Sequence, residues 1–427
     1  MKDNQKIKPT RIGVLGLGRE GKSVLEYLKK STQFQKAKIE VLDKKNGRDY
    51  LKGLARFDLI FRSPGVPYNL PELKKAREDG VAFSSVTRLF FENYKGKTIG
   101  VTGTKGKGTT STLIYKILKA AGKKVFLAGN IGKSAIEALA KNKNTPLAVL
   151  ELSSFQLHDL DISPEVAVIL DIFPDHQDAH ADLREYYEAK ANIAKFQKKS
   201  DRIYYFADNT MSRKLAVKSP AQKTAVDYKK FNEFKRTDLV IKGIHNFRNA
   251  VMAATVAKSF GVDWPTIKRV VKVYRGLEHR LEFVRKVKNV NFYDDSASTN
   301  PMTTVAALQA FGKEKKILIA GGMDKVWDYS PIVTALKKYK TEMVILFGEN
   351  KNKIRIAIKN SAKVKLVKNL EEAVKAAHKA CQEIPNNKSQ ITKYSVIFSP
   401  GAASFDMFQD YADRGRKFET LVRKLTK

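Results

Sequence analysis

The 427-residue chain carries 80 lysines and arginines against 44 aspartates and glutamates, a formal net charge of +36, and it has one cysteine. One cysteine excludes an internal disulfide. The length exceeds what one hydrophobic core usually supports, so we expect about two to four domains. No apolar run is long enough for a membrane span, and the polar N-terminal residues lack the pattern of a signal peptide, so we expect a cytoplasmic protein without membrane insertion.

The positive charge is spread along the whole chain. Lysine pairs stand at 29–30, 123–124, 198–199, 229–230 and 337–338. No interleaving of basic with aromatic residues and no basic tail stands out, so the pattern favours a lysine-rich solvated surface over a nucleic-acid site. We therefore expect no specific nucleic-acid partner.

The first segment of the chain has the pattern of a dinucleotide-binding unit. Strands are predicted at 11–17, 38–42 and 57–62. The first strand runs into Gly16-x-Gly18-x-x-Gly21, and the second ends at Asp43, an acid at the spacing found in such units. The third strand runs into Ser63, at a tight turn formed with Pro64 and Gly65. An NAD-dependent dehydrogenase is one function that this segment allows.

A phosphate-binding loop opens the second segment, within residues 99–113. A β-branched apolar run passes into a loop and then into a predicted helix at 111–121. The glycines of the loop are Gly103, Gly106 and Gly108. Glycine lets successive backbone N–H groups turn inward onto phosphate oxygens, and the helix dipole then points at them. This strand–loop–helix order predicts a nucleotide triphosphate site.

Side chains in and after the loop fit the same chemistry. Lys107 supplies a mobile positive charge for the terminal phosphates, and either Thr109 or Thr110 can offer a hydroxyl to Mg²⁺. The Walker A pattern is matched in part, because Val101 stands at the place of its first glycine and Gly108 follows the lysine in place of serine or threonine. We expect ATP to bind here.

The rest of the chain alternates predicted strands with predicted helices. Strands are expected at 124–127, 147–152, 166–172, 203–206, 290–293, 317–320, 343–347 and 394–398. Helices are expected at 183–197, 246–260, 303–311, 331–339 and 370–382. This alternation predicts an α/β protein with parallel sheets that helices cover on both faces.

Polar motifs follow several of these strands, where ligands bind in open α/β sheets. They are Glu151-Leu-Ser-Ser-Phe-Gln-Leu157, Asp175-His176-Gln177-Asp178, His245-Asn246-Phe-Arg-Asn249, Asp294-Asp295-Ser296 and Ser399-Pro-Gly-Ala-Ala-Ser404. Together and in this order they resemble the Mur ligase family, which builds the peptide stem of peptidoglycan. The resemblance runs from about Arg11 to Val422, and the string at 151–157 is most similar to the member that adds D-glutamate.

The resemblance implies three α/β domains. They are a Rossmann-like UDP-sugar-binding domain at 1–95, a central P-loop ATPase-like ATP-binding domain with a mostly parallel sheet at 96–275, and a Rossmann-like amino-acid-binding domain at 276–427. It also implies an ATP-dependent, ADP-forming ligase that uses Mg²⁺ and joins D-glutamate to UDP-N-acetylmuramoyl-L-alanine through an acyl phosphate. The expected form is a monomer.

Catalytic roles follow from the resemblance residue by residue. The matching positions are Lys107, Glu151, His176 and Lys190. Glu151 would hold Mg²⁺ between the β- and γ-phosphates, and His176 would serve a second Mg²⁺ or the acyl phosphate. Lys190 falls at the lysine that the family carbamylates, although its sequence context alone reads as a helical surface lysine. The implied metal ligands are Thr109, Glu151, His176 and carbamylated Lys190.

Binding roles follow in the same way. ATP contacts are expected from Gly103, Thr104, Lys105, Gly106, Lys107, Gly108, Thr109, Thr110, Asn246, Asn249, Arg280 and Asp295. UDP-sugar contacts are expected from Gly18, Arg19, Glu20, Gly21, Asp43, Ser63 and Asn130. D-Glutamate contacts are expected from Thr299, Lys325, Ser404 and Tyr411. The chain departs from the family pattern at Gly108 and at Ala297, where a lysine or bulky residue is usual.

Other functions remain as alternatives. The nearest is another Mur ligase with a different amino acid. A nucleotide-dependent nucleic-acid-binding protein would account for the net charge and the phosphate loop, but it leaves the strings at 151–157 and 399–404 unexplained. A dehydrogenase has no use for the phosphate loop.

Overall fold

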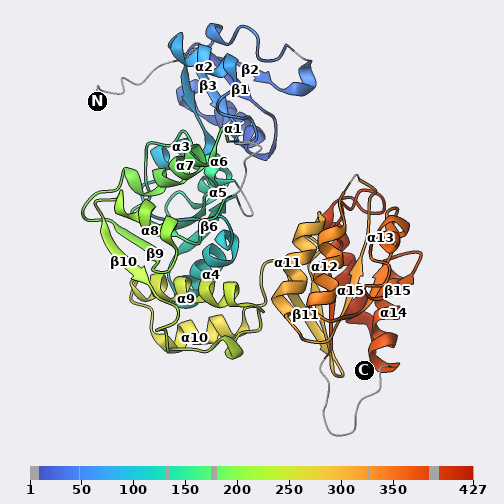
Figure 1. Ribbon diagram of the computed structural model, residues 1–427. Coiled ribbons are helices and arrows are strands. Elements are labelled where there is room, and N and C mark those ends of the chain that lie inside the picture. Colours follow the sequence, from blue (N-terminus) through green and yellow to red (C-terminus); the bar gives the residue numbers. More distant parts are fainter. Residues whose placement is uncertain are drawn as a thin grey trace. The chain divides into compact units, whose positions relative to one another are not determined.

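The computed structural model describes residues 9–47, 49–130, 134–174, 180–325, 327–383 and 394–426. Its strands form three sheets, coloured blue, cyan to green, and yellow to red in chain order (Figure 1). The chain divides into two compact units, Met1–Glu233 with Arg248–Val270 and Phe234–Phe247 with Val271–Lys427. The first unit holds two of the sheets and the second unit holds the third.

The first sheet is parallel, in the order β2-β1-β3-β4. The elements are β1 Arg11–Leu15, α1 Arg19–Lys30, β2 Lys38–Leu42, β3 Leu59–Arg62, α2 Pro71–Glu78, β4 Ala82–Ser84 and α3 Val86–Asn93. Ile12, Val14 and Leu15 on β1 are fully buried, because this strand lies inside the sheet and both of its faces are covered.

The central sheet is also parallel, in the order β10-β9-β8-β5-β7-β6. Its strands are β5 Lys97–Thr102, β6 Val125–Gly129, β7 Leu147–Glu151, β8 Val166–Ile169, β9 Arg202–Phe206 and β10 Gln222–Val226. The helices of this region are α4 Lys107–Ala120, α5 Ala135–Asn142, α6 Ser154–Leu157, α7 Leu183–Lys195, α8 Thr210–Val217, α9 Ile244–Lys258 and α10 Trp264–Val273. β5 lies between β7 and β8, so the loop after it opens at the middle of the sheet.

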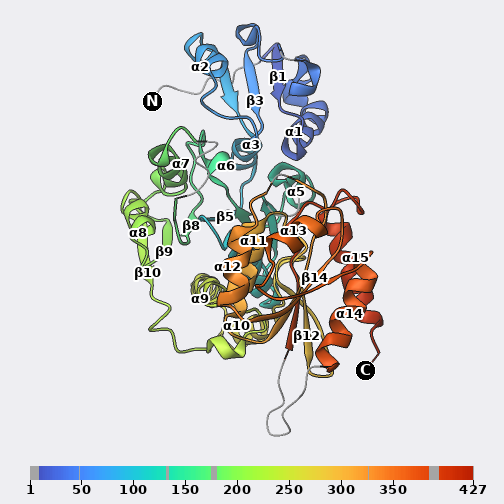
Figure 2. The same ribbon diagram turned by 45° about the vertical axis from the view of Figure 1, so that its right-hand side comes forward.

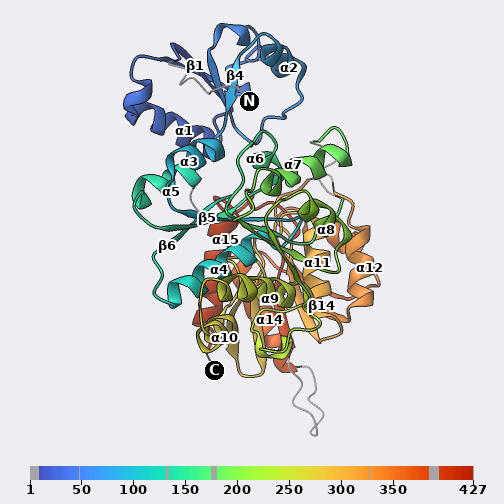
Figure 3. The same cartoon turned by 90° about the vertical axis from the view of Figure 1, so that its left-hand side faces the viewer.

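The first two sheets share one hydrophobic core. Helices α1, α3 and α5 lie side by side between them (Figure 3). Buried side chains such as Val24, Phe90 and Ile136 belong to one apolar cluster with residues of both sheets. A polar contact crosses the same junction. The guanidinium of Arg62, at the end of β3, donates to the carboxylate of Asp159 in the central region at 3.0 Å. This shared core explains why the two sheets form one compact unit.

The third sheet has the order β11-β12-β16-β13-β14-β15. Its elements are β11 Glu282–Val287, β12 Val290–Asp294, α11 Pro301–Phe311, β13 Lys316–Ala320, α12 Ser330–Lys338, β14 Thr341–Leu346, α13 Lys351–Ala357, β15 Lys363–Leu366, α14 Leu370–Glu383, β16 Tyr394–Phe398 and α15 Tyr411–Lys424. Helices α11 and α12 cover one face and α14 and α15 cover the other (Figure 2). Short 3₁₀ helices elsewhere lie at Thr32–Phe34, Lys44–Asn46, Leu54–Arg56 and Arg236–Asp238.

The α/β fold class with three sheets confirms the sequence prediction. One expectation was too simple, because β11 runs antiparallel to β12 through a two-residue hairpin and the third sheet is therefore mixed. Helix α4 begins at Lys107, four residues before its predicted start. The domain boundaries at 95/96 and 275/276 stay a prediction. Among the described residues, no helix is long and apolar enough to cross a membrane.

Candidate active site

The glycine-rich loop bends tightly between β5 and α4. Gly106 has a φ of +85°, and a Cβ there would lie 2.4 Å from the side-chain oxygen of Asn249. Only glycine fits both the backbone conformation and the space. Helix α4 starts at the next residue, so the N–H groups of its first turn face the loop and offer donors to an anion.

Two ammonium groups converge on the backbone of this loop. The Nζ of Lys107 donates to the carbonyl oxygens of Gly103 and Thr104, at 3.0 and 3.1 Å. The Nζ of Lys190, on α7, donates to the same Gly103 oxygen at 3.0 Å. Lys190 is only 2% exposed, so its interpretation as a surface lysine was wrong. Positive charge is thus concentrated where a polyphosphate would lie.

The hydroxyl groups of the loop differ in accessibility. The Oγ1 of Thr104 lies 2.8 Å from the hydroxyl of Tyr186 and accepts from the backbone N–H of Phe173 at 2.9 Å. Thr110 is fully buried, whereas Thr109 is partly exposed. Of the two hydroxyls that the sequence offered to Mg²⁺, that of Thr109 is therefore on the more exposed residue, and the choice between them stays a prediction. Lys105 is exposed and Gly108 is buried.

Glu151 ends the strand next to this loop. Register pairs it with Val101 on β5, two residues before Gly103. It is 7% exposed, and its Oε1 accepts a hydrogen bond from Asn130 at 3.2 Å. A carboxylate oxygen is a suitable ligand for Mg²⁺. His176, the other implied metal ligand, lies outside the described residues.

Helix α9 carries the two asparagines from which ATP contacts are expected. Asn249 lies against Gly106, and Asn246, which belongs to the second compact unit, donates to the Lys242 carbonyl at 2.7 Å. Arg248 between them was not predicted. Its guanidinium donates to both Asp171 and Asp208, with a shortest distance of 2.6 Å.

The Arg248 contacts connect α9 to the phosphate loop. The backbone N–H of Thr104 donates to the carbonyl oxygen of Asp171 at 2.9 Å, and Arg248 donates to the carboxylate of the same residue. The hydrogen bond from Arg248 lowers the pKa of the Asp208 carboxyl group. Arg248 also lies between the rings of Phe206 and Tyr228, 4.3 Å from each centroid. It is a positioning residue whose partners are far away in the sequence.

The first glycine loop is held by Asp43 and Ser63. The backbone N–H of Leu17 donates to Asp43 at 2.6 Å, and Ser63 donates to the Gly16 carbonyl at 2.6 Å. The Leu17 and Lys45 N–H groups lower the pKa of Asp43. A Cβ at Gly21 would lie 1.9 Å from the Gly16 oxygen.

The neighbouring residues of this loop face the central region. Arg19 donates to the carbonyl oxygen of Asn130 at 3.0 Å. Glu20 is buried and accepts from Gln156 at 2.6 Å, and burial raises its pKa. At Gly18 there is open space around the position of a Cβ. The expected UDP-sugar contacts of these residues stay a prediction.

In the second unit, Thr299, Lys325 and Ser404 follow the neighbouring strands β12, β13 and β16. Backbone hydrogen bonds join their loops, from Gly401 to Ser298 at 3.0 Å and from Met323 to Ala403 at 2.9 Å. Ser404 is buried, whereas Lys325 and Tyr411 are exposed. The fold thus brings three of the four expected D-glutamate contacts to one edge of the sheet.

Asp295 follows β12 at this edge of the third sheet, and it contacts Leu281, the residue after Arg280. It accepts from the Leu281 N–H at 3.1 Å and from the Ser399 hydroxyl at 2.7 Å. Burial raises the pKa of Asp295 to about 7. Arg280 itself is exposed. Ala297 donates its backbone N–H to the His279 carbonyl at 2.9 Å.

Arg414, on α15, is a buried residue that sequence reasoning missed. It is fully buried and donates to the hydroxyl and the carbonyl of Ser296, at 3.0 and 2.8 Å, and to the Ala403 carbonyl at 3.2 Å. Burial lowers its pKa to about 10, so it stays charged at neutral pH. Arg414 therefore fixes the loops after β12 and β16 relative to each other.

Replacing Arg414 with lysine is expected to lower the free energy of unfolding by about 3 kcal/mol, because a single ammonium leaves buried carbonyl oxygens unsatisfied. Urea unfolding measures this change. The exposed Arg416 on the same helix is the matched control, and Arg416→Lys should unfold like the unchanged protein. Equal midpoints for both variants would contradict the role given to Arg414.

Comparisons with known proteins found matches along most of the chain. Residues 101–266 match the Mur ligase middle domain, and residues 279–384 match the Mur ligase glutamate ligase domain. A UDP-N-acetylmuramoylalanine–D-glutamate ligase from Acetivibrio thermocellus is 35% identical, covering 99% of this chain and 98% of that protein. A second ligase of the same name, from Clostridium kluyveri, is 33% identical over 99% of this chain and 98% of that protein.

A solved structure shows the same fold at low identity. The UDP-N-acetylmuramate–alanine ligase from Thermotoga maritima superposes on this chain with a TM-score of 0.56 and 18% sequence identity. The match covers 97% of this chain and 99% of the ligase chain. At such identity the likeness bears on the fold alone.

Proposed function

Since this chain belongs to the Mur ligase family, we propose that it is an ATP-dependent ligase that adds D-glutamate to UDP-N-acetylmuramoyl-L-alanine in peptidoglycan precursor synthesis. The observation that supports this most is the phosphate loop with the ammonium of Lys107 on its backbone, beside the carboxylate of Glu151. The relatives that carry this activity in their names match almost the full length of the chain.

The proposed reaction joins two anionic substrates, and cations must offset their charge. The backbone of the loop at 103–108 and Lys107 would hold the triphosphate and stabilise the charge on the phosphoryl group in flight. The alanyl carboxylate attacks the γ-phosphorus, which gives an acyl phosphate and ADP. The amine of D-glutamate then attacks the acyl carbon, and phosphate leaves as the amide forms.

The residues beside the loop fit Mg²⁺. Glu151 provides a nearly buried carboxylate and Thr109 a partly exposed hydroxyl, both oxygen ligands of the kind that Mg²⁺ prefers. When bound, the ion would neutralise phosphate charge. We propose these two residues as its ligands, with His176 and Lys190 as implied by the family.

The acyl-phosphate route can be tested by isotope transfer. With ¹⁸O in the alanyl carboxylate, one ¹⁸O atom should appear in each phosphate released, because the carboxylate oxygen stays with phosphorus when the amide forms. Mass spectrometry of the phosphate measures this. Phosphate without ¹⁸O would exclude the acyl phosphate.

Lys190 gives a second test. If it carries a carbamate, the modified side chain supplies oxygen ligands instead of a cation, and Lys190→Ala should lose most activity. A short carboxylate such as acetate or formate should then restore part of the phosphate release. The exposed Lys195, in the last turn of the same helix, is a matched control. Full activity of Lys190→Ala would contradict the proposal. Loss of activity that acetate or formate does not restore would mean that Lys190 acts through its hydrogen bond to Gly103 and not as a carbamate.

A further inference from the structure

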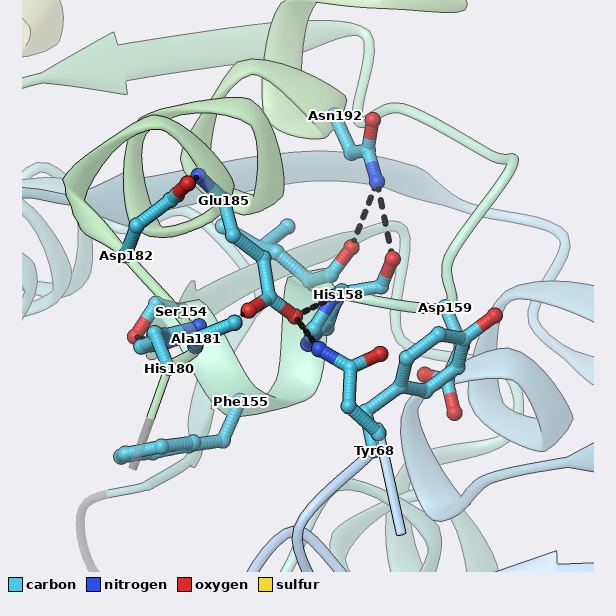
Figure 4. Close-up of polar contacts among 12 residues, drawn as sticks. Tyr68, Ser154, Phe155, His158, Asp159, His180, Ala181, Asp182, Glu185 and Asn192 are labelled. Carbon is cyan, nitrogen blue, oxygen red and sulfur yellow. Dashed lines mark hydrogen bonds and ion pairs between the residues drawn. The ribbon is translucent and has the colours of Figure 1, made fainter. Parts of the chain in front are cut away.

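A cluster of two histidines and a glutamate lies at the end of α6 and the beginning of α7 (Figure 4). His158 follows α6, His180 precedes α7, and Glu185 lies in the first turn of α7, whose N-cap is Asp182. One ligand atom from each of the three side chains lies within 4.8 Å of the other two. None of these side chains has a part in the ligase chemistry proposed above.

Hydrogen bonds to neighbouring groups fix the carboxylate. The Oε1 of Glu185 accepts from the side-chain amide of Asn69 at 2.5 Å and from the Nε2 of His158 at 2.8 Å. Its Oε2 accepts from the backbone N–H of Ala181 at 2.6 Å. These contacts come from three separate parts of the sequence, so the position of the carboxylate is set by the tertiary fold.

Aromatic contacts fix the two imidazole rings. His158 lies against Tyr68, with ring centroids 4.2 Å apart and ring planes tilted by 32°, and His180 stacks on Phe155, with centroids 5.1 Å apart and ring planes 9° from parallel. The Nε2 of His180 also lies 3.1 Å from the hydroxyl of Ser154. Rings held in this way lose little freedom when they bind an ion.

Two imidazoles and one carboxylate are the donor set of many three-ligand zinc sites, which keep a fourth position for water. Zinc–nitrogen and zinc–oxygen bonds of about 2.0–2.2 Å at a tetrahedral angle place the two ligand atoms roughly 3.3 Å apart. The nitrogen of His158 and the oxygen of Glu185 are 2.8 Å apart, so a shift of about half an ångström makes room for the ion in place of the proton they share.

We propose that His158, His180 and Glu185 form a zinc-binding site. The ion would tie the end of α6 to the start of α7, and Tyr68 and Asn69, on the loop between β3 and α2, contact two of its ligands. Nitrogen ligands distinguish this site from an oxygen-ligand Mg²⁺ site at the phosphate loop. The inference does not depend on the proposed ligase function, because metal binding is measured without substrates.

Cobalt titration tests the site. The full-length protein without a polyhistidine tag is stripped with a chelator and kept in excess Mg²⁺, which fills oxygen-ligand sites. Co²⁺ should then bind at one equivalent per chain with the strong visible absorption of tetrahedral cobalt, and Zn²⁺ should displace it. Zinc should also raise the Tm of the stripped protein, because it binds the folded state.

His158→Gln and Glu185→Gln should each weaken Co²⁺ binding by roughly 10-fold or more and abolish the rise in Tm, since loss even of an outer partner weakens metal sites by 10–100-fold. Asp182→Asn keeps the helix cap and removes a nearby carboxylate outside the cluster, so it should bind like the unchanged protein. X-ray absorption of the zinc-loaded unchanged protein should show two imidazoles, which keeps the test independent of how the variants fold. No tetrahedral cobalt band, or equal binding in all variants, would overturn the proposal.

Discussion

Lys107→Ala is expected to lower kcat by at least ~10²-fold, the scale for losing one preorganised electrostatic contact with a charged transition state. The ammonium of Lys107 already lies within the phosphate loop, bonded to the Gly103 and Thr104 carbonyls. It is therefore positioned before any nucleotide arrives and needs little rearrangement to meet charge that grows on the transferring phosphoryl group.

Phosphate release at saturating ATP measures this effect. Lys119→Ala is the matched control, because Lys119 is an exposed lysine in the last turn of the same helix. The control should keep its turnover, and both variants should keep the circular dichroism of the unchanged protein. Near-normal kcat in Lys107→Ala would remove the loop from the chemistry.

Lys325→Met is expected to depress kcat/KM for D-glutamate far more than it changes the KM for ATP. Lys325 is exposed on the loop after β13, and that loop is bonded to the loop that carries Ser404. An ammonium there can pair with a carboxylate of the amino acid, and a thioether of similar length cannot.

Steady-state kinetics with each substrate varied in turn give the two constants. Lys337→Met, at an exposed position on α12, serves as the control and should change neither constant. If Lys325→Met lowers kcat/KM for D-glutamate and raises the KM for ATP by equal factors, Lys325 belongs to the nucleotide site. The D-glutamate contacts proposed in the second unit would then have to be withdrawn.

The sequence predicted the parts of the fold that depend on local pattern. Buried strands with parallel neighbours are largely continuous apolar runs, so β7, β13 and β16 were found within a residue of their ends. The strands that were missed include β10 and β15, whose exposed edges carry Gln222, Lys223, Lys363 and Lys365. In β10, Gln222 and Lys223 lie on opposite faces, so this edge strand has no pattern that separates it from a loop, and β15 is only four residues long.

Without the family resemblance, the site could be predicted only where its residues lie next to one another in the chain. The loop from Gly103 to Thr110 is such a stretch. The burial of Lys190 could not be predicted, because it depends on a bond to Gly103, 87 residues away. Arg248 and Arg414 are similar cases. The hydrogen-bond partners of Arg248 lie 40 and 77 residues away in the sequence. Arg414 bonds to Ser296, 118 residues away, and to Ala403, 11 residues away. Long basic side chains read as surface residues until the fold supplies their acceptors.

The acceptor specificity of phosphate release tests the central proposal most directly. With ATP, Mg²⁺ and UDP-N-acetylmuramoyl-L-alanine present, single amino acids are offered and released phosphate is measured with each. D-Glutamate should support release, and D-alanine should be poorer by roughly 10³-fold or more, because a site that pairs a second carboxylate with Lys325 leaves that ammonium unpaired when the ligand lacks one. Equal rates with D-alanine, or no release with D-glutamate, would contradict the account.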